Sequence, residues 1–293
     1  MTTAETDGPP RKPDRKPRLA LPADACDTHF HVIGPEPVFP YMPERRLTPN
    51  EAPKKTIFAL HRHLDVGRGV AVQSGSTYGT DLGALLDLLR AGEGRYRGVA
   101  VIEEPVSDSR LRELHDAGVR GIRYFNLEHL RDLPSLDQRR RLGRRIAALG
   151  WHVVFLGDIR KAGVLDEFLS LGVPLVLDHM SRRSWNVLDP AGIAQPDFQV
   201  LLRAMEDERV WVKVSCADRI SKQGAPFADV APYARALIEA APDRVLWGTD
   251  YPHNHHKNVP DDADLVDFIA TVAPKPALMR KLMVDNPARL YGW

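Results

Sequence analysis

The chain has 293 residues, of which 43% are hydrophobic and 27% are charged, an ordinary composition for a globular protein. This composition excludes an intrinsically disordered chain, a collagen-like chain and a coiled coil. Because 40 basic residues balance 39 acidic ones, the net charge of +1 gives no sign of a nucleic-acid or membrane partner. No apolar stretch approaches the ~18 residues that span a bilayer, and two cysteines are too few for a disulfide framework. We therefore expect a soluble, cytoplasmic protein.

Residues 1–20 are rich in proline and basic side chains and contain few apolar ones. This composition predicts a flexible or surface-bound tail, and it lacks the apolar core of a signal peptide. Residues 21–293 contain no stretch with the composition of a linker, so we expect them to form a single domain.

Short runs rich in valine and isoleucine alternate with longer amphipathic stretches through this domain. The runs predicted to be strands are residues 25–34, 69–74, 97–102, 118–125, 151–157, 173–180, 210–216 and 244–250. The stretches that are most clearly helical are residues 81–92, 108–118, 136–150 and 158–172. This eightfold alternation is typical of an α/β fold of the (β/α)8 TIM-barrel type. A doubly wound open sheet is the alternative, but it calls for a glycine-rich phosphate loop after an early strand, which is missing.

Two longer segments interrupt the alternation, at residues 35–52 and 181–196. They follow the first and sixth predicted strands, so in a barrel they lie at the carboxyl ends of the strands, where active sites are built.

Ionisable side chains also gather at the predicted carboxyl ends of strands. The first strand carries His29 and His31, whose alternate positions place them on one face about 6–7 Å apart. The sixth strand ends in His179 and the eighth in Asp250. The arginines expected at the same face are Arg123, Arg182 and Arg219. Together these residues predict an active site at this end of the barrel.

The motifs that contain these residues resemble the amidohydrolase superfamily, and within it the branch of pyrone-dicarboxylate lactonases. The matching motifs are CDTHFH (26–31), LDHMSR (177–182), WVKVSCADR (211–219), WGTDYPH (247–253) and VDNPARLYGW (284–293).

This resemblance implies a hydrolase that opens a lactone carrying carboxylates, with Asp250 as the general base that activates water. It further implies that His29, His31 and His179 polarise the scissile carbonyl. The arginines would bind substrate carboxylates, as guanidinium groups do well. The substrate-contacting positions implied by the resemblance are Ser76, Arg123, His129, Arg182, Arg219 and His253.

The resemblance implies no metal cofactor, and nearby arginines would oppose a dication. The alternative is one Zn²⁺ bound by His29, His31, His179 and Asp250, which together offer suitable ligands. With zinc, the chain could be a metal-dependent decarboxylase or hydrolase of the superfamily, and an isomerase of lactones is a further alternative.

The chain differs from the lactonase pattern at His129, where that branch places an arginine, and at Leu47 and Phe155, where it places substrate-binding tyrosines. Neither of the latter two side chains can donate a hydrogen bond, so we expect a less polar or differently substituted ring as substrate. The expected partner is therefore a small anionic lactone, and the expected oligomeric state is a monomer or homodimer.

Overall fold

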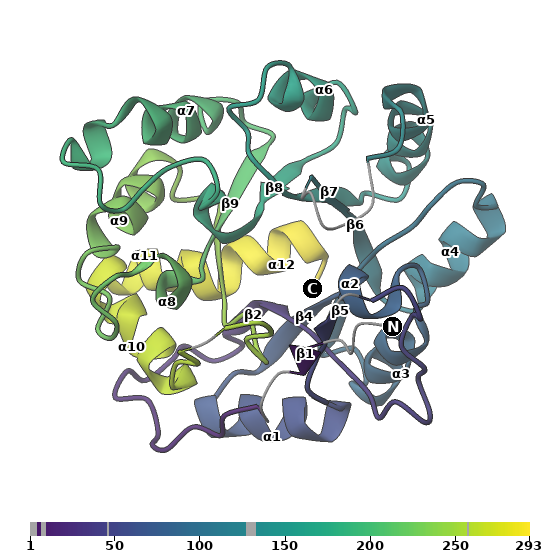
Figure 1. Ribbon diagram of the computed structural model, residues 1–293, viewed down its shortest axis with the longest axis horizontal. Coiled ribbons are helices and arrows are strands. Elements are labelled where there is room, and N and C mark those ends of the chain that lie inside the picture. The colour runs from purple at the N-terminus through teal and green to yellow at the C-terminus, as the bar shows by residue number, and fades with distance from the viewer. Residues whose placement is uncertain (1–4, 7–9, 46, 127–132, 257) are drawn as a thin grey trace.

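The computed structural model describes residues 5–6, 10–45, 47–126, 133–256 and 258–293. Eight parallel strands form one sheet, and helices surround it (Figure 1). In spatial order the strands are β2 (Cys26–Phe30), β4 (Arg68–Val72), β5 (Tyr96–Ala100), β6 (Val119–Phe125), β7 (His152–Leu156), β8 (Leu175–Leu177), β9 (Val210–Ser215) and β10 (Val245–Gly248). Each predicted strand run contains most or all of one of these strands.

The ring closes between the first strand of the sheet and the last. The amide of Asp250 donates to the carbonyl of His29, and the amide of His31 donates to the carbonyl of Tyr251, both at 2.8 Å. A parallel bridge pairs Phe30 with Tyr251 at the same place. The predicted (β/α)8 barrel is confirmed, and its closing hydrogen bonds lie at predicted site residues.

The helices alternate with the strands as the sequence predicts. They are α1 (Lys54–Leu64), α2 (Gly75–Tyr78), α3 (Gly83–Ala91), α4 (Asp108–Asp116), α5 (Leu136–Ala147), α6 (Val164–Leu169), α7 (Pro196–Ala204), α8 (Ala217–Ile220), α9 (Ala231–Ala240), α10 (Asp262–Val272), α11 (Pro276–Arg280) and α12 (Asn286–Tyr291). Short 3-10 turns cover Asp178–Ser181 and Gly192–Ala194, and a π-helical turn covers Lys281–Asp285.

One helix prediction is wrong at its start. We predicted a helix from residue 158, but α6 begins at Val164. Asp158 instead accepts a hydrogen bond from the amide of Arg160, and Gly163 adopts a left-handed conformation with φ of 78°. This local bonding of an aspartate competes with helix formation.

Two groups of buried side chains hold the barrel together. A cluster inside the barrel joins the inward-facing residues of the strands to α12, which closes the end opposite the predicted site. Its members include Cys26, Val70, Val99, Val154, Val176, Leu246 and Tyr291. A larger cluster fills the layer between the strands and the surrounding helices. These apolar clusters leave the polar groups to the end of the barrel where the strands have their carboxyl termini.

The two segments that interrupt the alternation lie where the sequence predicts. An antiparallel bridge between Ile33 and Ala52 closes the base of the 35–52 loop. This loop supplies Met42 and Arg45 to the cavity at the carboxyl ends of the strands, and the 181–196 segment supplies Arg182.

The described part of the N-terminal tail lies against α10. Arg15 forms ion pairs with Asp264 at 2.5 Å and Asp267 at 2.8 Å. The short strand β1 (Glu5–Thr6) pairs in parallel with β3 (Leu47–Thr48) of the 35–52 loop. The flexibility of this tail stays a prediction.

Within the described ranges, no helix combines the length and the apolar character needed to cross a membrane. The expected cytoplasmic location stays a prediction.

Candidate functional site

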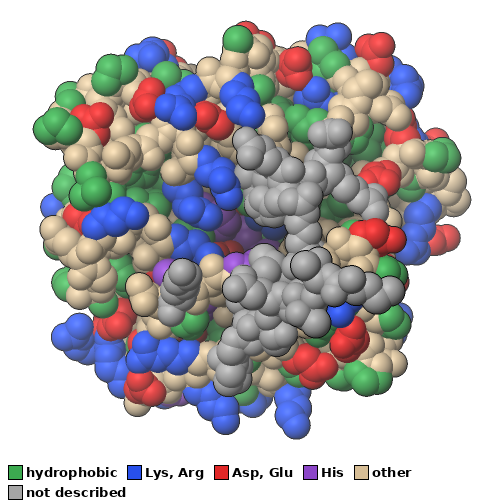
Figure 2. Space-filling view, viewed as in Figure 1, with side chains coloured by type: hydrophobic (Ala, Val, Ile, Leu, Met, Phe, Trp, Pro, Cys, Tyr) green, Lys and Arg blue, Asp and Glu red, His purple; other side chains and the backbone are tan. Residues whose placement is uncertain are grey.

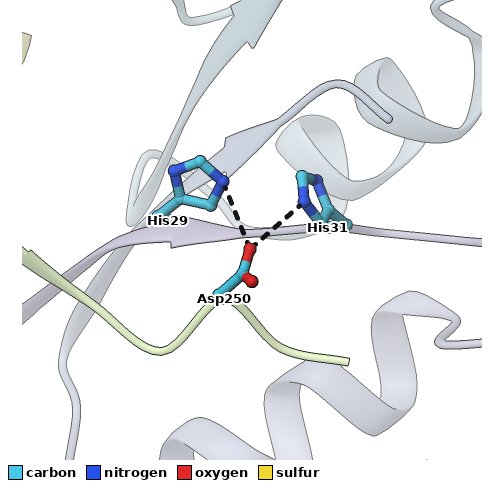
Figure 3. Close-up of side chains that lie close together, drawn as sticks. All are labelled: His29, His31 and Asp250. Carbon is cyan, nitrogen blue, oxygen red and sulfur yellow. Dashed lines mark ion pairs between the residues drawn. The ribbon is translucent and has the colours of Figure 1, made fainter. Parts of the chain in front are cut away.

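Asp250, which directly follows Thr249 after β10, faces His29 of β2 and His31, the first residue after that strand (Figure 3). Its Oδ1 lies 3.6 Å from Nε2 of His29 and 3.6 Å from Nε2 of His31. Alternation along β2 brings both rings to the same side, as the sequence predicts, and their centroids are 5.2 Å apart. These three groups meet because β2 and β10 close the barrel beside one another.

His179 approaches the same carboxylate oxygen from β8. Its Nε2 is 3.8 Å from Asp250 Oδ1, while its Nδ1 lies 2.9 Å from the hydroxyl of Ser215 and 3.1 Å from the thiol of Cys216. Three histidines therefore surround one oxygen of Asp250.

Left-handed backbone turns place these side chains. The φ angles are 54° at His179, 59° at Cys216 and 65° at Asp250, and each residue lies just beyond the end of a strand. Such conformations are unfavourable for residues other than glycine and are enriched at functional sites. Each turn directs its side chain over the end of the barrel.

The second oxygen of Asp250, Oδ2, accepts hydrogen bonds from two other side chains. Arg219 Nε donates to Oδ2 at 2.9 Å, and the Cys216 thiol donates to the same oxygen at 3.2 Å. Burial alone would raise the pKa of Asp250, but Arg219 and His179 outweigh it and bring the pKa well below its usual range. Asp250 is therefore an ionised carboxylate whose Oδ1 faces the histidines.

A second buried charge cluster lies beneath this one. Asp178 Oδ2 accepts two hydrogen bonds from Arg123, at 3.0 and 2.7 Å, and Asp178 Oδ1 lies 3.2 Å from the ammonium of Lys213. Although burial would raise the pKa of Asp178, these cations bring it well below its usual range. Asp178 and Lys213 are both fully buried and neutralise each other's charge.

His29 connects the two layers. Its Nδ1 is 3.0 Å from Lys213 Nζ, and its Nε2 faces Asp250. Burial lowers the pKa of His29 to about 3, so its ring is neutral.

A cavity of about 920 Å³ opens above Asp250, His31 and His179. Figure 2 shows this hollow at the centre of the face, with histidine side chains at its floor and basic side chains along its wall. The arginines that line it are Arg45, Arg123, Arg182, Arg183 and Arg219. The apolar side chains that line it are Met42, Val101, Ile102, Phe125, Leu133 and Leu156. The cavity therefore suits a small molecule that is both anionic and partly apolar.

The structure brings most of the predicted site residues to this cavity. The predicted residues that line it are His31, Ser76, Arg123, His179, Arg182, Arg219 and Asp250. His29 lies below the floor and is fully buried. His129 lies outside the described residues.

The structure places His253 away from the cavity lining. Its Nε2 is 3.0 Å from Asp262 and its Nδ1 is 3.9 Å from Asp218, and its ring is buried. Burial would lower the pKa of His253, but the adjacent Asp262 raises it overall. His253 is therefore not among the described residues that line the cavity, and the substrate contact that the resemblance implies for it stays a prediction.

Phe155 also turns away from the cavity. Its ring packs against Phe168 of α6, with centroids 4.3 Å apart, and the next residue, Leu156, is the one that β7 presents to the cavity. The apolar character expected from Phe155 therefore comes from its neighbour, while the side chain of Leu47 lies outside what the structure describes.

The sequence reasoning missed three residues that contact the site's histidines: Lys213, Ser215 and Cys216. Lys213 carried a usable signal, because a lysine in the middle of the apolar run VWVKVS is unusual for a strand buried on both faces. Ser215 and Cys216 carried none, since small residues at a strand end are common.

Several donor atoms are close enough to hold a metal ion. The sets whose ligand atoms lie within 4.8 Å of one another are His29, His31 and Asp250; His29, Asp178 and His179; and His179, Cys216 and Asp250. However, Arg219 occupies Oδ2 of Asp250, and the Lys213 ammonium contacts the outer nitrogen of His29. A ligating histidine normally has a carboxylate or carbonyl at this nitrogen, and here Asp178 Oδ1, at 3.1 Å, shares the position with the ammonium. The positive charges of Arg219 and Lys213 beside Asp250 and His29 therefore disfavour a dication.

Comparisons with known proteins agree with this arrangement. Residues 26–293 match the model of the amidohydrolase family. A 2-pyrone-4,6-dicarboxylate hydrolase of Comamonas testosteroni is 42% identical, over 94% of this chain and 92% of that protein. A 4-sulfomuconolactone hydrolase of Rhizobium radiobacter is 38% identical, over 94% and 92% of the two chains.

A solved structure supports the same relationship. It comes from Pseudomonas putida and is described as a candidate 2-pyrone-4,6-dicarboxylic acid hydrolase. It superposes with a TM-score of 0.77 and 32% identity, covering 93% of this chain and 98% of its own. From the family match and these identities, we conclude that the chain belongs to the amidohydrolase family.

Proposed function

We propose that this protein hydrolyses a small lactone that carries at least one carboxylate or similar anionic group. The observation that carries the proposal is an ionised Asp250 at the floor of a cavity whose described lining holds five arginines and two glutamates. Relatives that are 42% and 38% identical are hydrolases of a pyrone dicarboxylate and of a sulfomuconolactone, and both of these substrates are anionic rings.

Asp250 is the general base in this proposal. A water molecule bound near Oδ1 gives its proton to the carboxylate as its oxygen attacks the lactone carbonyl. The ring C–O bond then breaks, and the departing ring oxygen receives the proton from Asp250. The products are a carboxylic acid and a hydroxyl or enol on one open chain, so the proposed reaction consumes one water molecule and no cofactor.

The two histidines that border the cavity stabilise the negative oxygen that forms on the carbonyl. His179 can donate from Nε2 in its neutral form, because its Nδ1 can accept from the Ser215 hydroxyl. His31 donates from Nε2 only as a doubly protonated ring, since its Nδ1 donates to the carbonyl of Val72 at 2.7 Å. His29 lies beneath them and orients Asp250.

The arginines differ in how ready they are to bind an anion. Arg123 is already paired with Asp178, and Arg219 is paired with Asp250. Nε of Arg182 is buried and has no hydrogen-bond partner among the described residues. Arg182 is therefore the first contact for a substrate carboxylate in this proposal.

Arg219 links binding to catalysis. While Arg219 holds Oδ2, the low pKa of Asp250 makes it a weak base. When a substrate carboxylate draws Arg219 toward itself, the pKa of Asp250 rises and the carboxylate becomes a better proton acceptor.

Replacing Asp250 with Asn removes the general base but keeps the shape of the side chain. We expect kcat on 2-pyrone-4,6-dicarboxylate, measured by the loss of ring absorbance, to fall by about 10²- to 10⁴-fold. The matched control is Asp243→Asn, because Asp243 is exposed and lies at the opposite end of the same strand. Full activity in a folded Asp250→Asn protein would exclude Asp250 as the base.

Replacing Arg182 with Ala removes the proposed anion contact. Because a charged hydrogen bond contributes about 1.5–3 kcal/mol, we expect KM for the dicarboxylate to rise about 10- to 100-fold, with a smaller change in kcat. The control is Arg144→Ala on the exposed face of α5. An unchanged KM would show that the substrate anion binds elsewhere.

Replacing Arg219 with Gln tests the link between this guanidinium and the base. Removing the positive charge raises the pKa of Asp250, so the carboxylate becomes protonated at a higher pH. We expect the acid limb of the kcat/KM profile to move to higher pH, in addition to an overall loss of activity. Normalised profiles of the variant and the wild type that superimpose would contradict this link.

A further inference from the structure

The neighbours of His29 and His31 differ at the outer ring nitrogen. His31 Nδ1 lies 2.7 Å from the carbonyl of Val72, which can only accept a hydrogen bond. His29 Nδ1 lies 3.0 Å from Nζ of Lys213, and an ammonium can only donate one. Both histidines face the same carboxylate oxygen, but their outer partners require a proton on Nδ1 of His31 and none on Nδ1 of His29.

We propose that Lys213 is a positioning residue that fixes His29 with its proton on Nε2, directed at Asp250. In this form His29 directs an N–H group at the base, with Nε2 3.6 Å from Oδ1, and offers no lone pair to a metal at that nitrogen. The catalytic part of this inference rests on the proposed lactone hydrolysis, whereas the tautomer itself does not.

The competing arrangement puts the proton on Nδ1 and gives it to Asp178. Asp178 Oδ1 is only 3.1 Å from Nδ1 of His29, but no hydrogen bond joins them, because this oxygen has no hydrogen-bond partner among the described residues. The Lys213 contact does meet the geometry of a hydrogen bond. Asp178 therefore stabilises the Lys213 ammonium at 3.2 Å rather than receiving the histidine proton.

Burial keeps this arrangement in place. Lys213, Asp178 and the ring of His29 are each 0–1% exposed, so bulk water cannot replace the contact between them. A neutral imidazole ring carries its proton on only one of its two nitrogens. With Lys213 donating to Nδ1, Nε2 is the nitrogen that remains.

The direct test is nitrogen NMR of the resting wild-type enzyme labelled with ¹⁵N-histidine, with His29 assigned by comparison with His29→Gln. We expect a non-protonated shift at Nδ1 and a protonated shift at Nε2 for His29, and a protonated shift at Nδ1 for His31. A protonated Nδ1 at His29 overturns the proposal, whatever the activity of the enzyme.

Lys213→Met provides the second test, because Met has a similar length and lacks the ammonium. We expect the His29 proton to move to Nδ1 and kcat to fall about 10-fold or more, with little change in KM. We also expect the affinity for Zn²⁺, measured by calorimetry, to rise by about 10-fold because Nε2 now offers a lone pair. The matched control is Lys161→Met, which removes an exposed lysine.

The outcomes separate this inference from the proposed function. If Lys213→Met leaves both the His29 shifts and the zinc affinity as in the wild type, Lys213 does not set the tautomer. If the wild-type shifts are as expected but no lactone is hydrolysed, the inference about Lys213 stands and the proposed reaction falls. If Lys213→Met does not fold, the nitrogen shifts of His29 in the wild-type enzyme still test the proposed position of its proton.

Discussion

The closure of the barrel between β2 and β10 is the constraint on which the site depends. The amide of Asp250 binds the carbonyl of His29, and this backbone contact sets the carboxylate beside the rings of His29 and His31. The same residues thus complete the sheet and form the floor of the cavity. A shift of one residue in this register would turn the histidines away from Asp250.

Charge balance explains how so many ionisable groups are buried together. Asp250 is paired with Arg219, and Asp178 is paired with Arg123 and Lys213, so each of these two carboxylates has a cation in contact. Uncompensated charges at these depths would cost several kcal/mol each. The pairing also gives the two oxygens of Asp250 different surroundings, because Oδ2 binds Arg219 while Oδ1 faces the histidines.

Much of the fold and part of the site could be predicted from the sequence, because the spacing of apolar runs indicates the strands and the positions of ionisable residues at strand ends indicate the site. Runs of valine and isoleucine at regular intervals indicated the eight strands, and His29 and His31 two residues apart indicated a shared face. The start of α6 could not be predicted, because Asp158 bonds locally to Arg160 where a helix was expected. The placement of His253 between Asp218 and Asp262 depends on contacts across loops, which local patterns do not contain.

The role proposed for Lys213 shows a further limit of sequence reasoning. A lysine within an apolar strand run can be noticed, but its partner is 184 positions away, and their contact follows only from the folded structure. The left-handed turns at His179, Cys216 and Asp250 could not be predicted from the sequence either, since nothing in these residue types requires a positive φ.

The central claim is that Asp250 and the surrounding cations open an anionic lactone without a metal. The most direct test measures turnover of 2-pyrone-4,6-dicarboxylate and metal content in the same enzyme sample, before and after exhaustive chelation. We predict that turnover is unchanged while far less than one metal ion remains per chain. Turnover that falls in proportion to the metal removed and returns when Zn²⁺ is added would contradict the claim.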